Sequence, residues 1–215
     1  MKSLILTIAA LLVVASSQAA VISQTFSLSN AATVPDGDLS GLVQSITPTT
    51  TITNLDSITV TLNTTGGWNG DLYAYLWHGG EISVLLNRTG RNSSPAGIIG
   101  SGTGGMSLTF DDAAPADIHN APGGFGSALT GTFQPSGRNI HPLNALDTTP
   151  RTAMLGTFIG DPAAGEYRLY IADVAAGDTA TLVSWSITLT GQAIPEPGTA
   201  ALGLLASLTL LRRRR

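Results

Sequence analysis

The sequence contains no cysteine, so disulfide bonds cannot hold the fold together, and stability must come from a hydrophobic core or from bound metal ions. Charged residues are also scarce, at 11% of the chain. Five of the ten basic residues and one of the fourteen acidic residues lie in the two chain ends discussed below. The remaining body carries five arginines, no lysine and a net charge of about −8. Such a surface repels polyanions, and we therefore expect no nucleic-acid partner.

Patterns typical of catalytic centres are missing as well. The chain contains neither the G-x-S-x-G motif of hydrolases nor the H-E-x-x-H motif of zinc enzymes. The three histidines, His78, His119 and His141, stand at no recognisable spacing from catalytic partners. The run GSGTGG at residues 100–105 satisfies G-x-G-x-x-G, but a nucleotide site needs a strand before it and a helix after it. We interpret it as part of a surface loop over residues 90–105, and we expect no enzymatic activity.

The first residues, MKSLILTIAALLVVASSQAA, begin with a basic side chain at Lys2 and continue with an apolar stretch over residues 4–15. Small residues suited to cleavage follow, with Ala19 as the best cleavage position and Ser17 two residues before it. This order is typical of a secretory signal peptide. A buried N-terminal helix fits less well, because no polar face interrupts the apolar run. We therefore expect residues 1–19 to be a signal peptide and the body to be exported.

Between the two ends, short segments alternate apolar and polar residues with a period of two. The clearest are SITVTLN, LYAYLWH, YRLYIAD and LVSWSITLTG, and weaker ones are VISQTFSL, TTTITN, ISVLLN, MSLTF and LTGTF. This period, with many β-branched and aromatic residues, is typical of half-buried strands. Gly79 and Gly80 lie between two such segments and indicate a tight hairpin turn. The sequence therefore predicts one all-β domain over residues 20–191, a jelly-roll-like antiparallel β-sandwich.

Two groups of aspartates lie in predicted loops and are candidates for a calcium site. The first is Asp36 and Asp38 in PDGD, and the second is Asp111, Asp112 and Asp117 in FDDAAPAD. Calcium takes six to eight hard oxygen ligands, which carboxylates and loop carbonyls can supply together. The alternative is that these side chains accept hydrogen bonds from turn amides and keep the surface solvated.

The segment LYAYLWH places three aromatic side chains, Tyr73, Tyr75 and Trp77, on the same face of a predicted strand. If this face is open to solvent, it forms a stacking platform suited to sugar rings. If a loop or the second sheet covers it, the three rings are part of the core.

Several motifs resemble the P domain, also called P/Homo B, the β-sandwich that follows the catalytic domain in subtilisin-like proprotein convertases. They include GDLYAYL, SVLLNRTG and GTFQPSGR, and the likeness runs through about 150 residues. The family's closing pattern is matched by Gly165, Tyr167, Leu169, Ile171, Asp173, Leu182, Trp185, Ile187 and Gly191. Tyr167 replaces the more usual tryptophan, and we expect Trp185 to fill the core. The resemblance implies an association with proteases, but we expect no room for a catalytic domain with its Ser-His-Asp triad.

The chain end resembles the PEP-CTERM sorting signal of bacterial exported proteins. Its elements are Pro195, Glu196 and Pro197, an apolar stretch over residues 198–211, and the cluster Arg212, Arg213, Arg214 and Arg215. A helix over the apolar stretch would rise about 21 Å, less than the roughly 30 Å of a bilayer core. The resemblance implies a temporary membrane anchor over residues 192–215 that an exosortase-like enzyme cuts. An ordinary short membrane anchor is the alternative.

Together these observations predict a non-catalytic, exported bacterial protein of the cell surface or extracellular matrix, with a binding or structural role. Its expected partners are the processing enzyme, extracellular polysaccharide and, before processing, the membrane. The alternative is an accessory P domain that docks on and stabilises a separate subtilisin-like serine protease at the cell surface.

Overall fold

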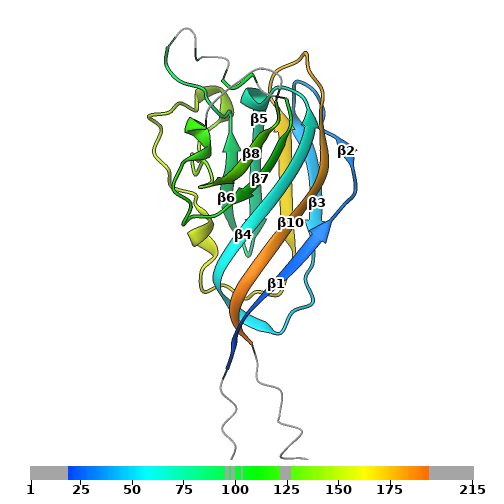
Figure 1. Cartoon of the computed structure of the whole chain (residues 1–215), viewed down its shortest axis with the longest axis vertical. Coiled ribbons are helices and arrows are strands. Elements are labelled where there is room, and N and C mark those ends of the chain that lie inside the picture. The colour runs from blue at the N-terminus through cyan, green and yellow to red at the C-terminus, as the bar shows by residue number, and fades with distance from the viewer. Residues whose placement is uncertain (1–18, 95–96, 98–99, 103, 122–126, 194–215) are drawn as a thin grey trace, which may run out of the picture. The chain divides into compact units, whose positions relative to one another are not determined.

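The computed structural model describes residues 19–94, 97, 100–102, 104–121 and 127–193, which form ten strands in two sheets (Figure 1). The six-stranded sheet contains β1 (Val21–Leu28), β10 (Ala180–Ala193), β4 (Ile52–Gly66), β7 (Met106–Phe110) and β8 (Leu129–Phe133) in this order, with β2 (Ala32–Thr33) also paired to β10. The four-stranded sheet contains β3 (Asp38–Ile46), β9 (Tyr167–Asp173), β5 (Leu72–His78) and β6 (Glu81–Asn87) in this order. The prediction of an all-β fold is confirmed.

The core lies between the two sheets and follows from the alternation in the strands. In β5 the residues Leu72, Ala74 and Leu76 are fully buried, whereas the side chains between them are half-buried. Trp185 of β10 is among the largest fully buried side chains and belongs to the same apolar cluster as Tyr167 of β9. The prediction that Trp185 fills the core is confirmed.

The sheets differ from the prediction in one pairing. Strands β7 and β8 run parallel, with Met106 opposite Leu129 and Phe110 opposite Phe133, so the six-stranded sheet is mixed and not wholly antiparallel. Parallel neighbours need a crossover between them, and here the chain over residues 111–128 provides it. Because the alternation within a strand does not reveal the direction of its neighbour, the sequence pattern missed this pairing.

Most strand limits agree with the sequence pattern. The segments LYAYLWH, YRLYIAD, MSLTF and LTGTF coincide with β5, β9, β7 and β8, and Gly79 and Gly80 form the β5–β6 turn with positive φ angles of 62° and 101°. The pattern missed β3, where Gly41 adopts a φ of 60° and the register between Asp38 and Leu42 shifts. A bulge at that point breaks the simple period of two.

The outer face of the six-stranded sheet is polar but almost uncharged. Its hydroxyl side chains form hydrogen-bonded pairs across the strands, Ser23 with Thr190 at 2.6 Å and Thr25 with Thr188 at 2.8 Å. Thr61 and Thr109 form a third pair at 3.2 Å. Such cross-strand pairs stabilise a sheet without charged residues, which suits the low charge of the sequence.

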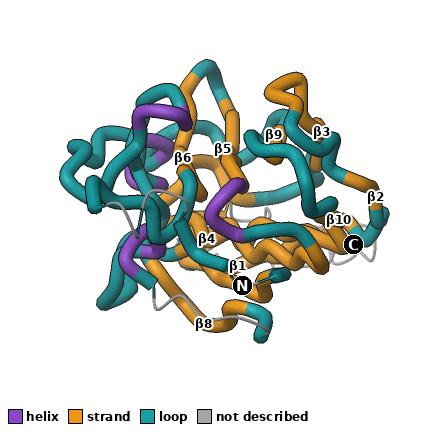
Figure 2. Tube along the Cα trace, turned by 90° about the horizontal axis from the view of Figure 1, so that it is seen from above, coloured by secondary structure: helices purple, strands orange, loops and turns teal. Residues whose placement is uncertain are grey.

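Short 3-10 turns lie between the strands: η1 (Asn69–Asp71), η2 (Ile118–Asn120), η3 (Pro142–Asn144) and η4 (Leu155–Phe158). Of these, η2 and η4 contact β6. Much of the chain between β8 and β9, green to yellow in Figure 1, lies on the side of β6, where Figure 2 shows loops and helical turns. This segment hydrogen-bonds the free edge of β6, through Val84 N to Ala153 O at 2.9 Å and Gly137 N to Val84 O at 2.8 Å. The edge of β6 is therefore protected against pairing with another chain.

Two of the sequence predictions concern chain ends. The sorting motif and nearly all of the signal peptide lie outside the described residues. Within the residues that the structure describes, no helix has the length and apolar character needed to cross a membrane.

Candidate functional site

Three tyrosines from two strands cluster on the outer face of the four-stranded sheet. Tyr75 of β5 stacks on Tyr170 of β9, with ring centroids 4.7 Å apart and ring planes inclined by 18°. Tyr73 lies 5.9 Å from Tyr75 and 6.0 Å from Tyr170, in tilted and edge-on arrangements. All three side chains are half-buried, so the rings are neither core nor fully exposed. We call Tyr73, Tyr75, Trp77, Arg168 and Tyr170 the aromatic face.

Gly41 of β3 leaves the space into which the Tyr170 ring fits. A Cβ atom at Gly41 would lie 2.8 Å from two ring carbons of Tyr170 and 2.7 Å from the carbonyl oxygen of Ile171. The Tyr170 hydroxyl donates a hydrogen bond to the Leu39 carbonyl, which holds the ring across β3. The ring is thus fixed by three strands, and its position costs little entropy when a ligand binds.

Trp77 takes part in a different arrangement from that of the tyrosines. The guanidinium of Arg168 lies 4.7 Å from the centroid of the Trp77 ring, a cation–π contact. Arg168 also forms an ion pair with Glu166, at 2.6 Å from Nη2 to Oε2. One side of Trp77 is therefore occupied by a planar cation, and the stacking surface consists mainly of the tyrosines.

Burial disfavours ionisation of two tyrosine hydroxyls on this face, those of Tyr73 and Tyr170. It raises the pKa of Tyr73 to about 12, and the neighbouring Tyr75 and Tyr170 add to the rise. Burial likewise raises the pKa of Tyr170. The Tyr73 and Tyr170 hydroxyls therefore remain protonated over the whole physiological pH range.

The aromatic face continues into exposed apolar side chains on β3. Val43, which pairs with Tyr170, is 55% exposed, and Leu39 is 43% exposed. Large apolar side chains next to aromatic rings at a solvent-facing surface are typical of binding sites. The face offers ring surfaces for stacking and phenol groups for hydrogen bonds, and sugar rings have matching apolar and hydroxyl sides.

The sequence pattern placed Tyr73, Tyr75 and Trp77 on one face, and the structure agrees. The prediction from the sequence did not include Tyr170 and Arg168, although the alternation in YRLYIAD puts both on the same side of their strand. The register brings them together, because Tyr75 pairs with Tyr170 and Trp77 with Arg168. Pairing between strands almost a hundred residues apart is not visible in a local pattern.

Asp36 and Asp38 lie in or beside the turn between β2 and β3. Asp36 accepts hydrogen bonds from the Gly177 amide at 3.1 and 3.2 Å, and Asp38 accepts one from the Ser40 amide at 2.7 Å. The hydrogen bond from Ser40 lowers the pKa of Asp38. Both carboxylates therefore stabilise loop backbone, as the alternative to calcium predicts.

The second aspartate group has other partners. Asp111 accepts from the Ala113 amide at 2.8 Å, and Asp112 accepts from the Gly156 amide at 2.6 Å. Asp117 caps η2 and binds Arg138. Among the described residues, no three carboxylates or histidines are placed to hold one metal ion. Calcium binding stays a prediction, and an unchanged melting temperature after EDTA treatment would contradict it.

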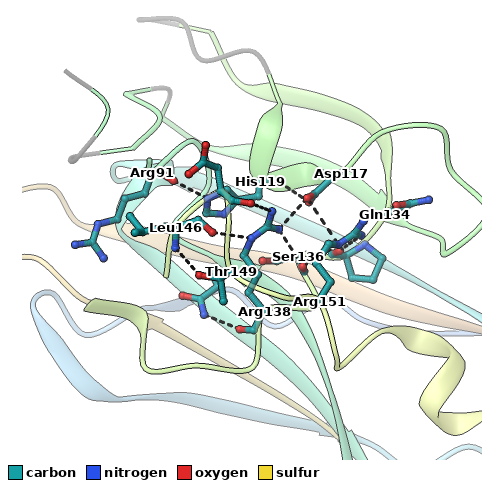
Figure 3. A network of polar contacts seen from close by, with 12 residues as sticks. Arg91, Asp117, His119, Gln134, Ser136, Arg138, Leu146, Thr149 and Arg151 are labelled. Atoms are coloured by element: carbon teal, nitrogen blue, oxygen red, sulfur yellow. Dashed lines mark hydrogen bonds and ion pairs between the residues drawn. The ribbon is translucent and has the colours of Figure 1, made fainter. Parts of the chain in front are cut away.

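Arg138 is the centre of a buried polar network (Figure 3). Its side chain is 2% exposed and donates to Asp117 at 2.8 Å, and to the carbonyls of Leu146, Asp147 and Ser136 at 2.9, 2.9 and 3.1 Å. Arg151 joins the network 3.7 Å from the same Asp117 oxygen. This network fixes the irregular segment that protects β6. Nothing in the spacing of these residues predicted it.

The histidines contact backbone groups. Both ring nitrogens of His78 face carbonyl oxygens, of Glu166 at 3.1 Å and of Pro162 at 2.9 Å. His119 Nε2 bonds the Arg91 carbonyl at 2.7 Å, and His141 Nδ1 accepts from the Leu143 amide. These contacts give each histidine a structural role.

Residues 135–189 match the proprotein convertase P-domain. No curated protein was found to match the sequence. A solved structure of a serine protease from Aeromonas sobria in complex with a chaperone is similar at 15% sequence identity and a TM-score of 0.44. That similarity covers 82% of this chain, and the chain spans 28% of the protease-complex chain.

The P-domain match begins in the segment that covers β6 and ends in β10. It contains Arg138, Arg168, Tyr170 and Trp185, but not β5 with Tyr75. The aromatic face is thus formed by one strand inside the match and one strand before it.

Two further acids lie at one end of the four-stranded sheet, Asp173 fully buried and Asp71 half-buried. Asp71 pairs with Arg88 at 2.8 Å, and Asp173 accepts from the Ala175 amide at 3.3 Å but has one oxygen without a partner. Burial raises the pKa of Asp173 to about 6, and the charges of Asp71, Asp36 and Asp178 add to the rise. Burial raises the pKa of Asp71 as well.

We expect the Asp173→Asn variant to be more stable than the wild type above about pH 6. Because the folded protein binds this proton more tightly than the unfolded chain, wild-type stability falls as the pH rises from about 4 to 6. The stability of the variant should fall less steeply with rising pH, because only the contribution from the raised pKa of Asp71 remains. Urea unfolding of both proteins at pH 4, 5, 6 and 7 measures the difference; parallel stability curves would contradict the expectation.

Proposed function

We propose that the protein is a non-catalytic, exported bacterial module of the cell surface or matrix, and that its aromatic face binds extracellular polysaccharide. The proposal combines the P-domain match over residues 135–189 with the chemistry of this face. Export is proposed because the first residues have the pattern of a signal peptide, and sorting is proposed because the chain end resembles a PEP-CTERM signal.

One observation supports the binding role most strongly: the stacked pair Tyr75 and Tyr170 remains partly open to solvent although it is rigidly held. Gly41 and the Leu39 carbonyl position the Tyr170 ring, and exposed Val43 extends the surface. A ring pair that served only packing would be covered by further chain. Stacking on pre-ordered aromatic rings supplies affinity at a small entropic cost.

The test uses the body, residues 20–193, and affinity electrophoresis in gels that contain one polysaccharide each. We expect Tyr75→Ala and Tyr170→Ala each to weaken binding about tenfold, since each removes one of two stacked rings. The matched control is Thr61→Ala on the outer face of the other sheet, which should bind like the wild type. Unchanged binding by both tyrosine variants would contradict the proposal.

Sorting is proposed on the residues at the chain end alone. In the producing cell, exosortase-like processing near Pro195, Glu196 and Pro197 would leave a mature protein that ends close to this motif. Mass spectrometry of the mature protein decides this, and a C-terminus at Arg215 would contradict it.

The P-domain match also supports a second candidate, an accessory domain that docks on a separate subtilisin-like serine protease. The two functions differ in the partner that the immobilised body should capture from the producing cell's surface fraction. Under the first proposal the captured material should be enriched in polysaccharide. Under the second it should be enriched in a protease, whose melting temperature the body then raises.

A further inference from the structure

We propose that the aromatic face selects neutral over acidic polysaccharide, and that Glu166 sets this selectivity by neutralising Arg168. This inference rests on the proposed polysaccharide binding. It assigns a specificity-determining role to an ion pair that lies beside the stacking rings.

Arg168 is held from two sides. Its Nε and Nη2 atoms both contact Glu166 Oε2, at 2.7 and 2.6 Å, and its guanidinium covers Trp77 at 4.7 Å from the ring centroid. Hydrogen bonds from Arg168 and then Ser45 lower the pKa of Glu166, so the carboxylate is ionised at neutral pH. The pair therefore has no net charge, and both partners are anchored to the sheet.

Arg168 is the only arginine or lysine on this face among the described residues. The other arginines bind elsewhere: Arg88 to Asp71, Arg91 to the Pro142 carbonyl, Arg138 to Asp117 and Arg151 to Gln134. A further charge that acts on this face is negative, since the pKa of Tyr170 is raised by burial, by Tyr75 and then by the charge of Asp38. With Arg168 neutralised, the face has no cation free to attract a uronic acid.

The ion pair is accessible to a ligand. The Arg168 side chain is 49% exposed and that of Glu166 is 36% exposed. An acidic sugar that reached Arg168 would have to share the guanidinium with Glu166 or displace it. In either case two carboxylates face one cation, so one negative charge is left uncompensated. A body with a net charge of about −8 adds long-range repulsion. Neutral sugar rings stack on the tyrosines without breaking the pair, so the selectivity arises from the penalty on the acidic ligand.

The experiment compares a neutral soluble glucan with polygalacturonate of similar length, at low salt. The wild type should bind the glucan at least about tenfold more tightly. Glu166→Gln should raise the affinity for polygalacturonate several-fold and in a salt-sensitive way, because it frees the Arg168 charge. Its affinity for the glucan should stay within about twofold of the wild type.

The double variant Glu166→Gln, Arg168→Gln is the matched control. It should not show the raised affinity for polygalacturonate that is expected of Glu166→Gln alone. Wild-type preference for polygalacturonate, or an unchanged ratio in Glu166→Gln, would overturn the inference. Both outcomes leave the proposed function standing if Tyr75→Ala still weakens binding. If Tyr75→Ala and Tyr170→Ala change the binding of neither polymer, the proposed function fails and the inference fails with it.

Discussion

Replacing Arg138 by alanine is expected to lower the free energy of unfolding by about 3–5 kcal/mol, because it breaks a buried ion pair by removing one partner. Asp117 would keep the His119 amide as a donor, but its remaining contact with a cation would be the longer one to Arg151 at 3.7 Å. The carbonyls of Leu146 and Asp147 would lose the hydrogen bonds from Arg138. Urea unfolding at pH 7 measures the effect.

Two controls separate this effect from a general loss of charge. Arg168→Ala removes an arginine whose ion pair is exposed, and its stability should stay close to that of the wild type. Arg138→Lys keeps the charge but not the planar fork, and it should fall between the wild type and Arg138→Ala. If Arg138→Ala unfolds at the same urea concentration as Arg168→Ala, the network has no special role in stability.

Trp185→Ala is expected to destabilise the fold by about 3–5 kcal/mol, because it leaves a large cavity between the sheets. Trp185 is 1% exposed and packs in the cluster shared by both sheets. Without disulfide bonds to restrain the unfolded chain, the fold depends on such packing.

Trp185→Phe should lower the free energy of unfolding by less than half as much as Trp185→Ala. Phenylalanine retains most of the apolar volume, and the indole Nε1 that it removes is buried without a hydrogen-bond partner. Thermal and urea unfolding of both variants give the comparison. Equal losses for the two would mean that a polar contact of Trp185, rather than its volume, stabilises the core.

Local patterns predicted the strands well where one face is buried. In β5 and β9 every second residue enters the core, so the alternation identified their limits. It failed at β3, where Gly41 lies in the left-handed region and the register shifts. The loop over residues 90–105 also differs from the expectation of a plain surface loop, because Ser101 is buried and its amide bonds the Thr89 carbonyl.

The candidate site was only half visible in the sequence. Tyr73, Tyr75 and Trp77 stand on one strand, and their common face follows from the period of two. Tyr170 and Arg168 join them only through the register of β9 against β5, and the covering of Trp77 by Arg168 depends on a side-chain contact. For this reason the main stacking pair is Tyr75 with Tyr170, and not Tyr75 with Trp77.

By itself the sequence determined the all-β class, the strands with a buried face, the buried Trp185 and the low charge of the body, since composition and local periodicity carry these properties. Only the tertiary structure decided the parallel pairing of β7 with β8, the buried network of Arg138 and the assembly of the aromatic face. These features arise from contacts between residues far apart in the chain. Their partners are selected by packing and register, which leave no repeating pattern in the sequence.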